Sequence, residues 1–239
     1  MVFLSNAINF VAYFLKSMHY PAAQASNMVT NFMGTSFLLT IFGGFISDSF
    51  FTRFTTFIVF CTVELLGLII LTVQAHEPQL QPAMNTRPSG IEAAILYSGL
   101  YAMAIGVGGV KASLPAHGAD QLDNGDRRLI SAFFNWFFFS LCAGGLIAAT
   151  VMVWIEENLG WNWSFKISVL VLTLAFCIFT IGFPFYRYKR PAGGSPLTRI
   201  FKVLASTARN WKMSTAETVS EDGVPEINRA NGRLRDKFK

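Results

Sequence analysis

Long apolar runs alternate with short polar stretches along this chain, a pattern typical of a protein that crosses a membrane several times. A helix needs about 20 mainly apolar residues to cross the hydrocarbon core of a bilayer. The first run is shorter and has neither a basic leading region nor a small-residue cleavage site, so it resembles the end of a span and not a signal peptide. The predicted spans are residues 1–15, 26–46, 57–73, 91–114, 131–155 and 165–185.

Composition agrees with a membrane protein. Hydrophobic residues make up 52% of the 239 residues and charged residues 14%, whereas a soluble domain carries about 25% charged residues. Three cysteines are too few for a disulfide scaffold, and no Cys or His cluster has the spacing of a zinc site. No nucleophile, base and acid stand together either. We therefore predict no metal, no cofactor and no enzyme activity.

Positive charge collects in the last part of the chain. Residues 1–185 hold seven Lys or Arg and nine Asp or Glu, whereas residues 186–239 hold twelve and five. Cytoplasmic loops of membrane proteins carry an excess of Lys and Arg. Arg53, the pair Arg127 and Arg128, and the basic residues in 187–190 therefore mark the cytosolic side. The tail 186–239 is predicted to be a basic cytosolic linker with an amphipathic helix near 197–211. It lacks the interleaved aromatics of a nucleic-acid-binding segment, so no nucleic-acid partner is predicted.

Two ionisable residues fall inside predicted spans, where charge is costly and usually functional. Lys111 lies in the fourth span, after a glycine-rich stretch. Its amine either faces a central cavity or extends along the helix to reach the membrane surface. Glu64, in the third span, is either a cavity carboxylate or a packed residue hydrogen-bonded to a neighbouring helix.

Three sequence motifs occur in a fixed order. They are GGFISDSFFTRF at 43–54, GVGGVKASLPAHGADQLD at 106–123 and FFNWFFFSLCAGG at 133–145. The first resembles the loop between the second and third helices of major facilitator transporters. The other two resemble the fourth-helix and fifth-helix signatures of the proton-coupled oligopeptide transporter family, and are most similar to its plant nitrate and peptide transporter branch. The resemblance covers nearly all of residues 1–212.

The resemblance implies an all-α polytopic membrane protein, the N-terminal six-helix lobe of a major facilitator transporter with a truncated first helix. Completed by a C-terminal lobe, such a lobe would carry protons together with nitrate, peptides or organic anions. Lys111 would be the cavity cation that interacts with substrate or with the coupling carboxylate, and Asp48 and Arg53 would belong to a gating loop. Thr56 would be a phosphorylation site or an ordinary threonine at a helix start. We expect an integral protein of the lipid bilayer, in the plasma membrane in preference to the vacuolar membrane.

The sequence differs from the family pattern in two places. The family's first helix carries an E-x-x-E-R motif of coupling carboxylates, and the alignment places that motif just before Met1. The fifth-helix signature usually has Asn-x-Gly where this chain has Cys142-Ala143-Gly144. One alternative is therefore a non-transporting truncated membrane protein, or a regulatory partner of a full-length transporter. A membrane enzyme is a third reading.

Overall fold

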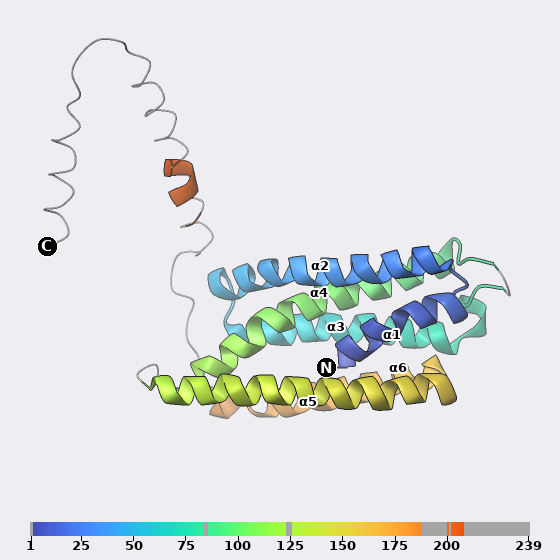
Figure 1. Cartoon of the computed structure of the whole chain (residues 1–239). Coiled ribbons are helices and arrows are strands. Elements are labelled where there is room, and N and C mark those ends of the chain that lie inside the picture. Colours follow the sequence, from blue (N-terminus) through green and yellow to red (C-terminus); the bar gives the residue numbers. More distant parts are fainter. Residues whose placement is uncertain (1, 84–85, 123–125, 188–199, 201, 208–239) are drawn as a thin grey trace, which may run out of the picture. The chain divides into compact units, whose positions relative to one another are not determined.

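A computed structural model describes residues 2–83, 86–122, 126–187, 200 and 202–207. Its main unit is a bundle of α-helices joined by short connections (Figure 1). The helices are α1 (Val2–Lys16), α2 (Ala22–Ser49), α3 (Arg53–His76), α4 (Ile91–Asp120), α5 (Arg127–Asn158) and α6 (Trp161–Ile181), with short 3₁₀ turns η1 (Pro78–Leu80) and η2 (Phe183–Phe185).

The all-α fold predicted from the sequence is confirmed, with five helices long and apolar enough to cross a membrane, α2 to α6, among the described residues. α1 has 15 residues. Most helices are longer than the predicted spans, because hydropathy marks only the part that suits hydrocarbon. Polar residues extend them: the Thr52 side chain accepts a hydrogen bond from the Thr55 N–H before α3, and Asp126 caps α5 in the same way.

The sixth predicted span, 165–185, extends past the last residue of α6. Helix α6 ends at Ile181, and Phe183–Phe185 form a 3₁₀ turn that contains Pro184. Gly182 and Pro184 are both poor helix formers, so the helix stops while the chain remains apolar. Hydropathy alone could not reveal this break.

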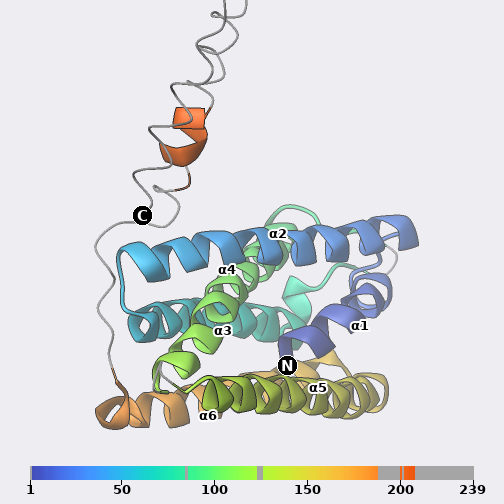
Figure 2. The same cartoon turned by 60° about the vertical axis from the view of Figure 1, so that its left-hand side comes forward.

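The helices α2 and α5 lie on opposite sides of the bundle, with α3 and α4 between them (Figures 1 and 2). The short α1 packs against both α2 and α5. It begins about midway along the bundle, so its described residues line only one half of the length (Figure 2). The most extensive packing joins α3 to α4.

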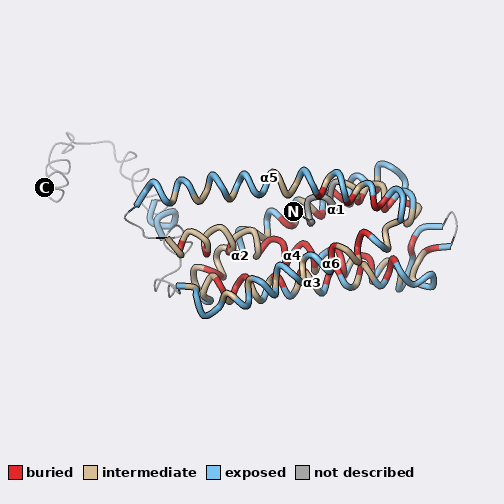
Figure 3. Tube along the Cα trace, turned by 90° about the horizontal axis from the view of Figure 1, so that it is seen from below, coloured by how far each residue is buried: buried red, intermediate tan, exposed pale blue. Residues whose placement is uncertain are grey.

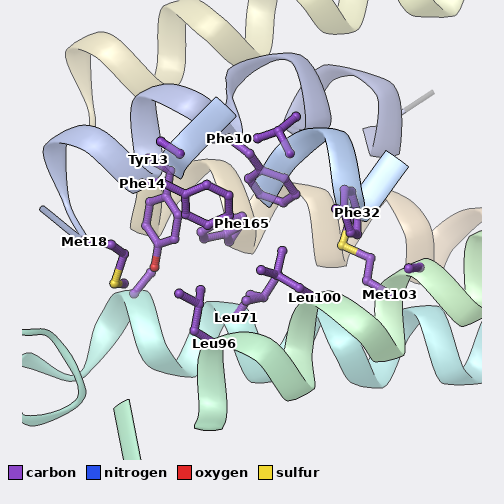
Figure 4. Packing of buried hydrophobic residues seen from close by; sticks show 14 of the residues in the cluster. Phe10, Tyr13, Phe14, Met18, Phe32, Leu71, Leu96, Leu100, Met103 and Phe165 are labelled. Carbon is purple, nitrogen blue, oxygen red and sulfur yellow. The ribbon is translucent and has the colours of Figure 1, made fainter. Parts of the chain in front are cut away.

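Aromatic side chains of α1 form the centre of the hydrophobic core (Figure 4). Phe10 lies edge-on to Phe32 of α2, with ring centroids 5.5 Å apart, and Tyr13 lies edge-on to Phe165 of α6 at 5.4 Å. Edge-to-face pairs at such distances are favourable. This cluster joins α1, α2 and α6 to the α3–α4 pair.

Glycines allow α3 and α4 to approach each other closely. A Cβ atom placed on Gly67 would lie 2.5 Å from the backbone nitrogen of Met103, and one on Gly106 would lie 2.4 Å from that of Glu64. Small residues allow this kind of close contact between membrane helices. Buried residues accordingly concentrate on α3 and α4, whereas α5 is largely exposed (Figure 3).

The chain beyond residue 195 forms a separate unit. Residues 200 and 202–207 are helical and fall within the helix predicted near 197–211. The rest of that predicted helix lies outside the described residues.

Candidate functional site

A cavity of about 440 Å³ lies among α2, α3, α4 and α5. Its wall is mostly apolar, with Phe37 from α2 and Phe137, Phe138 and Leu141 from α5. Of the described residues that line it, Glu64 and Lys111 are the charged ones. Glu64 belongs to α3 and Lys111 to α4, and both line the same cavity. The structure thus brings together the two ionisable residues that the sequence places in separate spans.

Lys111 is half-buried and its amine faces this cavity. The Nζ atom lies 4.3 Å from the centre of the Phe37 ring, a cation–π distance. Lys111 lies nine positions before Asp120, the last residue of α4, which corresponds to roughly 13 Å along a helix. This geometry favours the cavity role predicted for Lys111 over an amine that extends to the membrane surface.

Arg53, the first residue of α3, connects three helices at one end of the bundle. Its Nη1 donates to Asp120 Oδ2 at 2.6 Å and to the Ala116 carbonyl at 3.2 Å, both on α4. Its Nη2 lies 3.6 Å from Asp48 Oδ1 on α2. Asp120 is buried, whereas the side chain of Asp48 is partly exposed. The strong partner of Arg53 is therefore Asp120.

Asp48 and Arg53, predicted as parts of a loop, lie on helices. Asp48 belongs to the last turn of α2 and Arg53 begins α3, so the connection consists of residues 50–52. The loop is short because Thr52 caps the new helix directly.

Thr56 is fully buried, and its hydroxyl donates to the Thr52 carbonyl at 3.1 Å. A kinase needs an accessible hydroxyl, so this conformation favours the ordinary helix-start role. Phosphorylation at Thr56 would require the start of α3 to open.

Sequence reasoning missed two acidic residues. Asp120 stood inside a motif that was noted for Lys111, and its acidic charge within that motif, just beyond the fourth predicted span, was the available signal. Glu156, near the end of α5, is buried and accepts hydrogen bonds from Ser164 of α6, at 2.8 Å, and from Asn9 of α1. Beside the exposed Glu157, it was indistinguishable from an ordinary charged helix end.

Comparison with known families identifies the family of this chain. The sequence model of the POT family, PTR2, matches residues 54–231, which is most of the chain. This chain belongs to the POT family. The matched residues include Lys111, Glu64 and Asp120, whereas Phe37, Asp48 and Arg53 lie before them.

Similar proteins of the POT family occur in Arabidopsis thaliana. NRT1/PTR FAMILY 4.2 is 58% identical over 238 residues, which cover 100% of this chain and 46% of that protein. NRT1/PTR FAMILY 4.1 is 58% identical over 224 residues, 93% of this chain and 43% of that protein. The chain therefore spans about half the length of these curated relatives.

Solved structures of POT transporters share the fold. The in meso crystal structure of PepTSo has a TM-score of 0.69 and 22% identity, covering 82% of this chain and 37% of that one. A POT family transporter in complex with 5-aminolevulinic acid has a TM-score of 0.67 and 15% identity, covering 91% and 44%. The predicted architecture, one lobe of a larger transporter, is confirmed at the level of fold.

Proposed function

We propose that this chain forms the N-terminal lobe of a proton-coupled transporter for nitrate, peptides or small organic anions. The observation that carries the proposal is the cavity that holds Lys111 and Glu64 between α2 and α5. Membership of the POT family supports it, as do relatives named NRT1/PTR FAMILY and a structural neighbour whose title calls it a peptide transporter. Transporters of this architecture place substrate and ion sites at the interface of two repeats.

Lys111 supplies the positive charge of the cavity. Its ammonium group contacts the ring of Phe37. The cavity wall around it is mostly apolar and also contains Glu64. A small anion that enters gains a strong electrostatic contact there, because the surroundings screen charge poorly. The cavity thus favours anionic or carboxylate-bearing solutes.

The Arg53 network is proposed to act as a gate. Arg53 ties α3 to Asp120 of α4 and to Asp48 of α2 at the predicted cytosolic end. The contact of Arg53 with Asp48 is partly exposed, whereas its contact with Asp120 is buried. Helix α2 can therefore move away and break the first contact while the second keeps α3 joined to α4. Such an arrangement stabilises one state of the lobe and releases it when α2 moves.

The experiment exchanges this chain for the matching 238 residues of NRT1/PTR FAMILY 4.2. Uptake of nitrate, a dipeptide and a small organic anion is measured in oocytes at external pH 5.5 and 7.5. We expect uptake of at least one solute to be higher at pH 5.5. The Lys111→Ala variant should lose this uptake although it reaches the cell surface in normal amount. Lys111→Arg should also impair it, because the guanidinium is larger and stays charged.

Absence of pH-driven uptake in the exchanged protein, with the parent relative active in the same assay, contradicts the proposal. Full activity of both Lys111 variants removes Lys111 from the site. A fluorescent fusion of the same protein tests the proposed location in the plasma membrane, and labelling of the vacuolar membrane instead would contradict it.

A further inference from the structure

The chain that follows α6 turns back over the predicted cytosolic end of the bundle, where α4 and α6 both end (Figure 2). After the turn η2, the ring of Tyr186 packs edge-on against His117 of α4, with ring centroids 4.9 Å apart, and lies 5.2 Å from the ring of Phe179 of α6. A Cβ on Gly182 would lie 2.4 Å from the Tyr186 hydroxyl oxygen. The missing side chain at Gly182 therefore leaves the room that Tyr186 occupies.

Gln121, the residue that caps α4, holds the next residue of the chain by its backbone. The Arg187 N–H donates to Gln121 Oε1 at 2.8 Å, and Gln121 Nε2 donates to the Arg187 carbonyl at 3.3 Å. One carboxamide thus binds both backbone groups of a single residue, as a paired β-strand would. We call Tyr186 and Arg187 the linker strap, because the tail from residue 188 onward follows them directly.

The linker strap and the Arg53 network share two short pieces of backbone. On α4, Asp120 pairs with Arg53, and the next residue, Gln121, binds the strap. On α3, Arg53 makes the ion pair, and the ring of the next residue, Phe54, lies 6.0 Å from that of Tyr186. A shift of either piece of backbone therefore moves the strap contacts and the ion pair together.

The linker strap can leave its place without unfolding the bundle. His117 beneath it is only 4% exposed, and its Nε2 atom has no hydrogen-bond partner among the described residues. Such an atom destabilises the docked state, because it has lost water without gaining a partner. When Tyr186 lifts away, water can reach this atom. Water can also replace the two bonds between Gln121 and Arg187, which are exposed.

We infer that the linker strap is a latch through which the cytosolic linker controls the contact of Arg53 with Asp120. The docked strap anchors the end of α4 and keeps this contact closed. When the linker draws the strap away, the last turn of α4 loses that anchor and opens locally, and the contact with Arg53 weakens. The inference rests on the proposed gate for its role in transport, but the link between strap and ion pair belongs to the lobe itself.

The first test measures whether Arg53 is released together with the linker strap. The whole chain is reconstituted in lipid nanodiscs and treated with phenylglyoxal, which modifies guanidinium groups outside strong ion pairs, and peptide mass spectrometry measures the modification of Arg53. Gln121→Leu removes both hydrogen bonds to Arg187, and Tyr186→Ala removes the aromatic packing, so the two variants release the strap in different ways. Exposed Arg128 is the internal reference for the reagent.

We expect each variant to raise the modification of Arg53 relative to Arg128 about fivefold or more, the lower end of the usual coupling between two sites. Gln81→Leu is the matched control, because Gln81 also donates to a backbone carbonyl, that of Ala75 at 2.9 Å, but at the other end of α3. It should leave Arg53 at the level of the parent chain. Monodispersity and melting temperature of each variant separate release of the strap from general loosening.

A reversible crosslink tests whether the linker strap controls transport. The protein that carries this chain in place of the matching part of NRT1/PTR FAMILY 4.2 is used, with the exposed Cys142 and Cys177 replaced by alanine. Gln121→Cys and Arg187→Cys are joined by a short bifunctional methanethiosulfonate before reconstitution in proteoliposomes. We expect the joined strap to lose most of the uptake driven by low pH, and a reductant that cleaves the crosslink to restore it.

Unchanged modification of Arg53 in both Gln121→Leu and Tyr186→Ala overturns the inference, as does an equal rise in Gln81→Leu. If only one of the two strap variants folds, that variant decides. Full uptake with the crosslink closed also overturns the inference. Absence of uptake before any cysteine is introduced contradicts the proposed transport function instead, and the modification of Arg53 then still decides whether the strap and the ion pair are linked.

Discussion

Replacing Gly106 by alanine adds one methyl group at the closest approach of α3 and α4. The new Cβ would lie 2.4 Å from the Glu64 nitrogen and 2.5 Å from its Cα. Ordinary van der Waals contact begins at 3.4 Å, so the helices must separate locally by roughly 1 Å. The obstacle is backbone, which cannot turn aside as a flexible side chain would.

The expected cost follows from two opposing effects. Overpacking a well-packed interior costs about 1–3 kcal/mol. Alanine regains up to about 1 kcal/mol through its higher helix propensity. If alanine regains the full amount, the balance is a loss of about 0–2 kcal/mol, which corresponds to a drop in melting temperature of up to roughly 8 °C for a chain of this size.

Gly34 on α2 provides the control. A Cβ at Gly34 meets nothing within 4 Å, so Gly34→Ala gains helix propensity and adds no clash. We expect its melting temperature in the same detergent to equal or exceed that of the parent chain. Thermal unfolding of the three proteins, followed by tryptophan fluorescence or by loss of monodispersity, measures the difference.

A Gly106→Ala variant as stable as Gly34→Ala would refute the close α3–α4 contact. It would also remove the constraint that holds Glu64 beside Lys111. Conversely, a clear loss only at Gly106 supports both the packing and the position of the carboxylate.

Four further predictions concern the ends of the bundle. Arg53→Gln should lower the free energy of unfolding by about 1–3 kcal/mol, because it removes a charged donor from the buried carboxylate of Asp120. Asp48→Asn should cost below about 1 kcal/mol, because its contact with Arg53 is longer and partly exposed; equal losses in chemical denaturation would contradict this ranking. Glu156→Leu should cost about 1–3 kcal/mol by removing the acceptor of Ser164, and the neighbouring exposed Glu157→Leu should change stability little. Thr56→Asp should lower the melting temperature more than Thr55→Asp, since Thr56 is fully buried, and abundant phosphate on Thr56 in the folded protein would oppose that reasoning. A tag after residue 239 should survive protease treatment of sealed right-side-out vesicles, and its loss would reverse the predicted orientation.

The number, order and approximate limits of the helices followed from the sequence. Apolar run length and helix caps are local properties, so residues 57–73 could be identified as a span before any packing was known. Thr52 and Asp126 cap the helices that follow them with their own side chains. Ordered motifs around Lys111 were similarly sufficient to indicate the family.

Contacts between distant residues required the tertiary structure. Lys111 and Glu64 lie on different helices, and nothing in either local pattern determines which faces of α3 and α4 meet. That choice is made by Gly106, whose missing Cβ permits the two backbones to touch. Likewise, Arg53 could be expected to pair with Asp48 in the same motif, yet its shorter contact is with Asp120, 67 residues away.

Glu156 also shows that burial of a charged residue is decided by tertiary packing and not by the local sequence. Its charge suggested a solvated helix end like that of Glu157, but packing of α1 and α6 against α5 encloses it and supplies Asn9 and Ser164 as donors. Helix formation depends on hydrogen bonds between residues four apart, whereas burial depends on which neighbours fold over a position. The sequence therefore determined the helices and their membrane character, and only the packing of one helix on another decided which charges share a site.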